Sequence, residues 1–289
     1  MRKADGGHII RLPFRGARMD DKADVPDYDP TFASFDSPLM QVVRRQAYGE
    51  DIGQHSWVTA NQLRTDLARL SLTASSRLLD VGCGPCGPLV FLVRESGCRG
   101  TGVDVSVEAL SSGAARARAA GVEKRVELQR ANLDLPLPFE DRAFDAIISL
   151  DVILHIRDRK ALFGEIARVL APGGRFLFTD AGVISGVIST EEISLRSADR
   201  FAQFVPPGFN ETLLGSTGFR ITSEEDRTAS VILNAAGRLS ARRAHRPALE
   251  DVEGKDAFAT QQRYLETVIA LSERRALTRR MYCAERARD

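Results

Sequence analysis

The sequence predicts an α/β fold built on a doubly wound, mostly parallel sheet of seven strands, with helices at the N-terminus and an inserted helical cap. Two observations predict it. Short apolar runs alternate with helical patterns between residues 77 and 179. The first of these runs leads directly into a glycine-rich turn. Strands and helices that alternate at such short spacings form an open parallel sheet covered on both faces.

The chain before the first expected strand has two parts, residues 1–30 and residues 31–76. Residues 1–30 are polar and contain three prolines, so we expect a flexible arm there. Residues 31–289 are expected to form one domain. Its first segment, 31–76, has a helical pattern, because Leu63, Leu67 and Leu70 recur at helical spacing.

Five strands and three helices are expected between residues 77 and 179. The expected strands are 77–82, 100–105, 126–131, 144–150 and 175–179, and the expected helices are 89–94, 107–120 and 159–170. The alternation then stops. We interpret residues 181–216 as a cap or lid, because loops beyond strand ends usually carry function. A sixth strand (219–225), two helices (228–244 and 255–273) and a last strand (277–284) are expected to complete the domain.

Composition excludes several classes of protein. Forty basic and 39 acidic residues give a formal charge of +1, so no overall field favours nucleic acid or an anionic membrane. No apolar run approaches the roughly 20 residues of a membrane span, and the N-terminal residues lack a signal-peptide core. Four cysteines in this length do not make a disulfide framework, so we expect a cytoplasmic protein. A homodimer is left open.

The glycine turn reads Asp80-Val-Gly82-Cys-Gly84-Pro-Cys-Gly87. It satisfies the G-x-G-x-x-G pattern of dinucleotide sites, with Asp104 about 20 residues further on. Asp80 argues against a dinucleotide, because a carboxylate beside a diphosphate is repulsive in a partly desolvated cleft. The same carboxylate suits the ammonium group of S-adenosylmethionine (SAM), which has a ribose but no phosphate. The turn therefore favours SAM, and an NAD-dependent oxidoreductase is the alternative.

Further ligand contacts are expected around this turn. Gly82 and Gly84 let the backbone turn sharply and approach the ligand. Asp104 can accept both ribose hydroxyls, and Val105 would border the adenine; the alternative is a turn with a surface carboxylate that caps a helix. Cys83 and Cys86 form C-x-x-C without a second pair, so we expect small apolar fillers and no metal site.

The stretch from Leu78 to Asp180 resembles the class I SAM-dependent methyltransferases. The chain carries the Asp80–Gly84 loop, the Asp104 acid, Asp145 in the fourth strand and the Pro172-Gly-Gly174 turn of that family. The resemblance implies a Rossmann-like fold. It also implies that Asn132 binds the adenine amino group and that Leu133 offers its backbone N–H to the ring.

A finer resemblance covers most of the chain. Tyr48-Gly-Glu-Asp-Ile52, Asp151-Val-Ile-Leu-His155 and Phe178-Thr-Asp180 are similar to segments of the phosphoethanolamine, sarcosine and dimethylglycine N-methyltransferases. In the phosphoethanolamine enzymes, the residue that matches His155 lies beside the acceptor nitrogen, and the one that matches Gln54 lies near the SAM carboxylate. This chain departs from them at Leu150, which replaces an Arg and is expected beside the cofactor. Tyr28 is the nearest candidate for their N-terminal active-site Tyr.

Methyl transfer needs a desolvated, aligned and neutral nucleophile. An amine or hydroxyl must lose a proton, and a histidine, with an ordinary pKa of about 6.5, suits that task. We therefore predict His155 and Asp151 as catalytic residues; the alternatives are a packed loop histidine and a helix N-cap. We predict Trp57, Asp180 and Phe204 as acceptor contacts, against core packing for the rings and loop capping for Asp180.

The predicted function is the methylation of a small amine by SAM. O- or C-methylation of a secondary metabolite uses the same cofactor residues and differs only in the lid, so it stays open.

Overall fold

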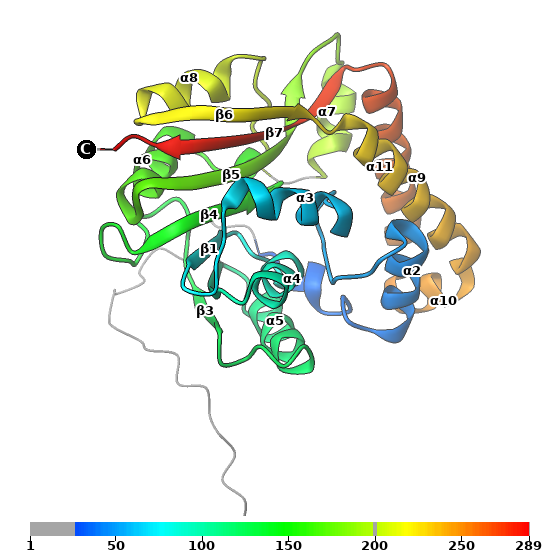
Figure 1. The fold of residues 1–289 in the computed structure, drawn as a ribbon. Helices are drawn as coiled ribbons and strands as arrows, with labels where there is room; N and C mark the ends of the chain where they lie inside the picture. The colour runs from blue at the N-terminus through cyan, green and yellow to red at the C-terminus, as the bar shows by residue number, and fades with distance from the viewer. Residues whose placement is uncertain (1–26, 199–200, 289) are drawn as a thin grey trace, which may run out of the picture.

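A sheet of seven strands forms the centre of the molecule, in the order β3-β2-β1-β4-β5-β7-β6 (Figure 1). The computed structural model describes residues 27–198 and 201–288, so most of the expected arm lies outside the described residues. Strands β1 to β5 run parallel, and β7 is antiparallel to β5 and to β6. The predicted seven-stranded, mostly parallel sheet is confirmed. The strands are β1 (Arg77–Val81), β2 (Arg99–Asp104), β3 (Val126–Arg130), β4 (Phe144–Leu150), β5 (Leu170–Ile184), β6 (Phe219–Asp226) and β7 (Leu277–Arg286).

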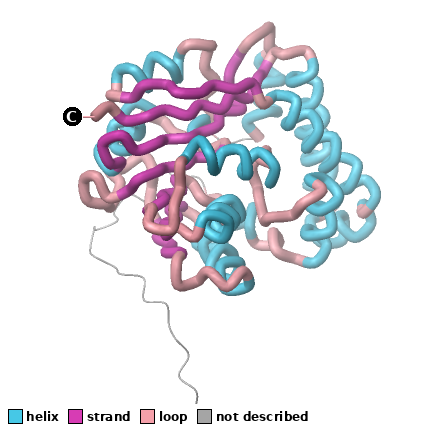
Figure 2. The backbone as a smooth tube through the Cα atoms, in the orientation of Figure 1, coloured by secondary structure: helices cyan, strands magenta, loops and turns pink. Residues whose placement is uncertain are grey.

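Helices cover both faces of the sheet (Figure 2). The helices before β6 are α1 (Asp29–Phe32), α2 (Pro38–Tyr48), α3 (Ala60–Leu70), α4 (Gly87–Ser96), α5 (Val107–Ala119), the 3₁₀ helix η1 (Ile153–His155), α6 (Arg159–Val169), α7 (Thr190–Ser197) and α8 (Phe209–Ser216). Three more lie between β6 and β7: α9 (Thr228–Ala244), α10 (Arg246–Glu253) and α11 (Lys255–Glu273). No helix in the described part of the chain combines the length and the apolar character that a membrane span requires.

Two hydrophobic clusters hold the layers together because side chains alternate along a strand. Leu78 of β1 packs into the cluster formed with α3, α4 and α5, and its neighbour Leu79 packs into the cluster formed with α6 and α8. Both leucines are fully buried. The alternation explains why the central strands are apolar along their whole length.

The cap differs from its predicted extent. We expected it within residues 181–216, but β5 continues to Ile184, and α8 packs against the sheet beside Phe163 and Phe219. Within that segment, Ala181 of β5 lines the site, as do Arg196, Ser197 and Ala198 at the end of α7, and α7 lies against α11. We refer to α7, α9 and α11, which all contribute lining residues to the site, as the cap; α9 and α11 are inserted between β6 and β7, and α2 packs against α9 (Figure 1).

The fifth strand is also longer than expected, because Pro172-Gly-Gly174 does not interrupt it. Leu170 pairs with Phe144 and Arg175 with Ala146, so the prolyl-glycine segment is a bulge inside β5. Gly173 has φ 74°, a conformation that glycine adopts without strain.

Candidate active site

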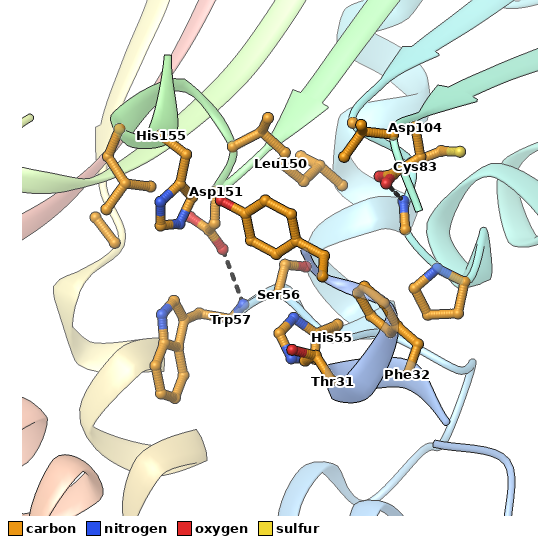
Figure 3. Close-up of a pocket in the computed structure, with 18 of the residues that line it drawn as sticks. Thr31, Phe32, His55, Ser56, Trp57, Cys83, Asp104, Leu150, Asp151 and His155 are labelled. Carbon is orange, nitrogen blue, oxygen red and sulfur yellow. Dashed lines mark hydrogen bonds between the residues drawn. The ribbon is translucent and has the colours of Figure 1, made fainter. Parts of the chain in front are cut away.

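A cavity of about 310 Å³ opens at the carboxyl ends of β1, β2, β3 and β4. The strand order reverses between β1 and β4, and ligands bind at such a switch point in open α/β sheets. The cavity has two ends (Figure 3). Cys83 and Asp104 lie on one side, and His155 and Trp57 lie on the opposite side. We refer to these as the glycine-turn end and the histidine end.

The glycine turn is held against β2 by its own backbone. The N–H groups of Gly82 and Cys83 both donate to the Val103 carbonyl, at 2.9 and 3.0 Å. Gly82 has φ 77°, and a Cβ there would stand 2.5 Å from Cγ1 of Val152. A side chain at this position would therefore meet both backbone strain and a clash, which accounts for the glycine.

Asp80 is a buried carboxylate that faces the cavity. It is 2% exposed, and no described residue donates a hydrogen bond to it. Burial, together with the nearby charge of Asp104, raises the pKa of the Asp80 carboxyl to about 8. A cation beside such a buried carboxyl group would stabilise its ionised form and lower its pKa.

Asp104 is held by two backbone groups. Gly84 N–H donates to Oδ2 at 2.8 Å and Ser106 N–H donates to Oδ1 at 2.9 Å. Burial raises the pKa of Asp104 as well. Each carboxylate oxygen has a second lone pair, so Asp104 keeps acceptor capacity toward the cavity that it lines.

The other predicted cofactor contacts surround the same end. The cavity is lined there by Gly82, Gly84, Val105, Asn132, Leu133 and Leu150. Asn132 Oδ1 accepts from the Asp134 N–H at 3.0 Å, which orients the amide at the end of β3. The structure thus brings together all but one of the predicted cofactor residues.

The side chains of Cys83 and Cys86 pack between the glycine turn and the neighbouring elements β2 and α5. Their sulfur atoms lie 3.4 Å apart, and both residues are buried. Glycines face them: a Cβ at Gly102 would be 2.9 Å from the Cys83 sulfur, and one at Gly113 would be 2.4 Å from the Cys86 sulfur. Burial and the hydrogen bond with Cys86 raise the pKa of the Cys83 thiol, which suits a packing role.

His155 ends the 3₁₀ helix after β4 and lines the histidine end. Its Nδ1 lies 2.9 Å from the carbonyl oxygen of Phe201. A carbonyl only accepts, so Nδ1 carries the proton, and in the neutral ring the basic lone pair is on Nε2. The ring of Tyr28 lies edge-on to the imidazole, with centroids 6.3 Å apart. Tyr28 also lines the cavity.

Asp151 lines the cavity, but both of its carboxylate oxygens already accept hydrogen bonds. It accepts from the Trp57 N–H at 2.8 Å (Figure 3) and from the Thr179 hydroxyl at 2.8 Å, and it forms an ion pair with Arg279. Burial alone would raise its pKa, but the charge and hydrogen bonds of Arg279 outweigh burial and hold the pKa of Asp151 below its ordinary value. A carboxylate so stabilised is a weak base, which favours a positioning role over the predicted catalytic one.

Trp57 belongs to both the core and the cavity wall. It is 5% exposed and packs in a cluster with Ala181 and with residues of α9 and α11. The guanidinium carbon of Arg238 lies 5.2 Å from the ring centroid. The Asn234 amide donates to the Trp57 carbonyl at 2.7 Å, so the residue is fixed on both sides.

Three predicted site residues lie outside the cavity. Asp180 is fully buried in an ion pair with Arg159 (2.6 Å) and accepts from Asn210. The Gln54 side chain closes its own loop, because it accepts from Ile52 N–H and donates to the Glu50 carbonyl. Phe204 packs on a cluster with Leu271 and Leu277. These side chains support the fold, and the structure does not bring them to the ligand.

The structure also shows site residues that the sequence did not indicate. They are Thr31 and Phe32 of α1, Arg196 and Ser197 of α7, Arg238 of α9, and Gln261 and Tyr264 of α11. Helix α1 reaches the site because Asp29 accepts from the Ser106 hydroxyl at 2.5 Å, which holds α1 against α5.

Comparison with known proteins places this geometry in a family. Residues 79–178 match the family model described as "Methyltransferase domain". The O-methyltransferase resE of Aspergillus sclerotiorum is 30% identical over 213 residues, which cover 71% of this chain and 78% of that protein. This chain belongs to the SAM-dependent methyltransferases. S-adenosylmethionine is therefore its cofactor.

Other relatives extend the comparison. Methyltransferase GfsG of Streptomyces halstedii is 38% identical over 120 residues, which cover 42% of each chain. The glycine/sarcosine/dimethylglycine N-methyltransferase of Actinopolyspora halophila is 29% identical over 177 residues, or 61% of this chain and 31% of that protein. This methyltransferase thus spans less than half the length of both relatives. The resemblance to N-methyltransferases that the sequence indicated is confirmed.

The fold has counterparts among solved structures. The phosphoethanolamine N-methyltransferase 2 of Haemonchus contortus, solved with phosphomonomethylethanolamine and S-adenosylhomocysteine, superposes with a TM-score of 0.75. It is 21% identical and covers 92% of this methyltransferase, which spans 61% of that chain. At this identity the likeness concerns the fold.

The glycine-turn end of the methyltransferase fits SAM. Asp80 is a buried carboxyl without a donor, and a cation in the cavity would stabilise its ionised form. The ammonium group of SAM would supply such a cation. Asp104 has acceptor capacity left for the ribose hydroxyls, whereas two carboxyl groups beside a diphosphate would repel it.

Proposed function

We propose that this methyltransferase transfers the methyl group of SAM to the nitrogen of a small amine. The observation that carries the proposal is the hydrogen bond between His155 Nδ1 and the Phe201 carbonyl, 2.9 Å long, at the edge of the cavity. It fixes the tautomer that carries the basic lone pair on Nε2. Aliphatic amines are protonated at neutral pH, so the site must take a proton before the nitrogen can attack.

The cavity supports a small acceptor. Its volume of about 310 Å³ has to accommodate the cofactor as well as the acceptor, and ligand sites commonly measure about 300 to 1,000 Å³. Trp57, Tyr28 and Tyr264 line the histidine end. These rings give that end of the cavity apolar walls, which would help to exclude water from the acceptor nitrogen during transfer.

Each of the site residues would have a separate role in the reaction. Asp80 and Asp104 would hold the ammonium and the ribose of SAM, which supplies an electrophilic methyl group when bound. His155 would accept the proton that leaves the amine, at Nε2. Asp151 would keep Trp57 and Arg279 in place at the edge of the site. The nitrogen would then be aligned and kept from bulk water by the cap.

O-methylation is the second candidate, because resE, a relative that matches 71% of this chain, is an O-methyltransferase. With His155 as the base, O-methylation would favour acceptors with acidic hydroxyl groups. A phenol has a pKa of about 10, near that of an amine, whereas an aliphatic alcohol is too weak an acid for an imidazole.

Transfer of label from methyl-labelled SAM to a panel of small amines, phenols and aliphatic alcohols tests the proposal. We expect label on at least one amine and none on the aliphatic alcohols. Label on phenols alone would show that the methyl acceptor is a hydroxyl group and not an amine. A panel with no labelled amine, assayed with protein that binds S-adenosylhomocysteine, would overturn the proposal.

A further inference from the structure

Arg159 of α6 and Asp180 of β5 form a buried ion pair close to the 3₁₀ helix that ends at His155. Arg159 Nη1 lies 2.6 Å from Asp180 Oδ2, and the two side chains are 1% and 0% exposed. The Asn210 amide of α8 contacts both partners: its Oδ1 accepts from Arg159 at 2.9 Å, and its Nδ2 donates to Asp180 at 2.9 Å. The pair therefore joins three elements of the fold.

Stability alone does not account for this ion pair. Moving two charges out of water is costly, and replacing a buried ion pair by packed apolar residues of similar volume is often neutral or stabilising. Neither Arg159 nor Asp180 is among the residues that line the cavity. The contact made by the second terminal nitrogen of Arg159 indicates what the pair holds in place.

Arg159 Nη2 donates to the backbone carbonyl of Gln203 at 2.5 Å. The backbone of Gln203 is held from its other side as well, because its N–H donates to the Leu154 carbonyl at 2.7 Å. Leu154 directly precedes His155 in the 3₁₀ helix. Two residues after Gln203, Val205 pairs with β5 through an isolated β-bridge. Gln203 is thus a fixed point between α6 and the 3₁₀ helix.

The Phe201 carbonyl, which accepts from His155 Nδ1, lies two residues before this fixed point. Consecutive Cα atoms are about 3.8 Å apart, so the anchored Gln203 limits where the Phe201 carbonyl can lie. The Phe201 side chain contributes less, because it is 36% exposed. A continuous series of contacts therefore leads from Asp180 through Arg159 and Gln203 to the imidazole.

We propose that Arg159 is a positioning residue for His155. It holds the Phe201 carbonyl where that oxygen accepts from Nδ1, and it thereby keeps the imidazole in the tautomer whose lone pair is on Nε2. Without this acceptor, either nitrogen of the neutral ring can carry the proton, and a protonated Nε2 cannot accept one. A guanidinium suits the role because its fork reaches a carboxylate and a carbonyl at the same time. The use of this tautomer in catalysis rests on the proposed function, whereas the positioning rests on the contacts of Arg159.

The tautomer of His155 can be measured without any methyl transfer. The protein is labelled with ¹⁵N-histidine, saturated with S-adenosylhomocysteine and studied by long-range ¹H–¹⁵N NMR at a pH about two units above the ordinary histidine pKa of about 6.5, where the ring is neutral. The chain has four histidines, and the signal that is missing from His155→Asn identifies His155. We expect the wild type to carry the proton on Nδ1.

Arg159→Lys is the variant that isolates the contact with the carbonyl. Lysine keeps the charge beside Asp180, but its single nitrogen does not span both the carboxylate and the Gln203 carbonyl. His155 should then lose about half or more of its Nδ1–H form, because no fixed acceptor favours that nitrogen. Circular dichroism and the thermal midpoint of the variant are measured alongside.

Arg168→Lys is the matched control. Arg168 lies on the same helix, pairs with Glu165 and donates to the Phe139 carbonyl at 2.8 Å, so the substitution removes the same kind of fork elsewhere. It should leave the His155 tautomer as in the wild type.

Three results would overturn the proposal: a wild-type proton on Nε2, a wild-type tautomer in folded Arg159→Lys, or an equal shift in Arg168→Lys. Should Arg159→Lys fail to fold, the double variant Arg159→Gln/Asp180→Asn removes both buried charges together. The same loss of the Nδ1–H form is expected from it, and its absence would have the same contrary meaning.

Steady-state rates, measured with the acceptor that the panel identifies, separate the positioning from the proposed reaction. Arg159→Lys should lower kcat about tenfold or more, while the KM of the acceptor and the affinity for S-adenosylhomocysteine stay within about twofold. A changed tautomer with a wild-type kcat would leave Arg159 as a positioning residue and remove His155 as the base. A lowered kcat with an unchanged tautomer would overturn the positioning role and leave the proposed base standing.

Discussion

Arg279 of β7 and Asp151, the first residue after β4, form a two-point ion pair beneath the cavity. Arg279 Nε lies 2.8 Å from Asp151 Oδ1, and Nη2 lies 3.1 Å from Oδ2. Arg279 is 1% exposed, and Asp151 has φ 61°. Because Asp151 also accepts from the Trp57 N–H, the pair joins β4, β7 and the N-terminal segment at the wall of the site.

The first prediction concerns the stability that this pair provides. Asp151→Asn keeps the size of the side chain and tolerates the left-handed backbone, but it leaves the Arg279 charge buried and uncompensated. We expect the free energy of unfolding to fall by about 3–5 kcal/mol, as measured by urea denaturation. Glu266→Gln, which breaks the exposed pair with Arg243, should cost less than about 1 kcal/mol. Equal small losses in the two variants would show that the buried pair is dispensable.

The second prediction concerns the pH dependence of the free protein. An unfolded chain releases the Asp80 proton near pH 3.8, whereas burial and Asp104 raise the pKa of the folded group to about 8. The folded state therefore binds more protons between these values, and the contribution of Asp80 to stability falls as the pH rises from about 4 to about 8. Asp80→Asn should lack this decline, and thermal unfolding of ligand-free protein across pH 5–8 measures it. Parallel curves for the two proteins would contradict the assignment.

The third prediction is a release of protons when the ligand binds. The ammonium of S-adenosylhomocysteine should favour ionised Asp80, so binding at pH 7 should release up to about one proton. Calorimetry in two buffers of different ionisation enthalpy measures the release. Asp80→Asn should release none, while Asp145→Asn, altered at the opposite end of β4 where Asp145 pairs with Arg77, should match the wild type. A wild-type enthalpy that is independent of the buffer would place the ammonium elsewhere.

The fourth prediction tests the ribose assignment. Asp104→Ala removes an acceptor at the end of β2 and should weaken S-adenosylhomocysteine binding by about tenfold to a hundredfold. Asp104 also holds the N–H groups of Gly84 and Ser106, so the variant's circular dichroism and thermal midpoint have to be measured alongside. Near-normal affinity in a folded variant would exclude Asp104 from the ligand contacts.

The cofactor end could be predicted from the sequence because its residues are local to strand ends. Asp80, Gly82 and Asp104 each follow a short apolar run, and the parallel sheet brings the carboxyl ends of neighbouring strands to one edge. The glycine conformations were predictable too, since a tight turn between strand and helix requires them.

The cap was not predictable in the same way. Arg196, Arg238 and Tyr264 come from three helices that are separated in sequence and meet only through packing. Asp180 was misplaced for a related reason. Nothing near it in the sequence indicates that Arg159 and Asn210 enclose its carboxylate, and a buried partner of this kind redirects a side chain that a strand end would otherwise present to the ligand.

The last prediction concerns His155 and separates proton transfer from support of the loop. His155→Asn can keep a donor toward the Phe201 carbonyl but has no basic nitrogen, whereas His155→Ala loses both. If the imidazole accepts the acceptor's proton, both variants should lower kcat by about a hundredfold or more and bind S-adenosylhomocysteine as the wild type does. If the ring only holds the loop that contains Phe201, Asn should restore most of the rate that Ala loses. Single-turnover rates of the three proteins, measured with the acceptor that the panel identifies, distinguish the two roles.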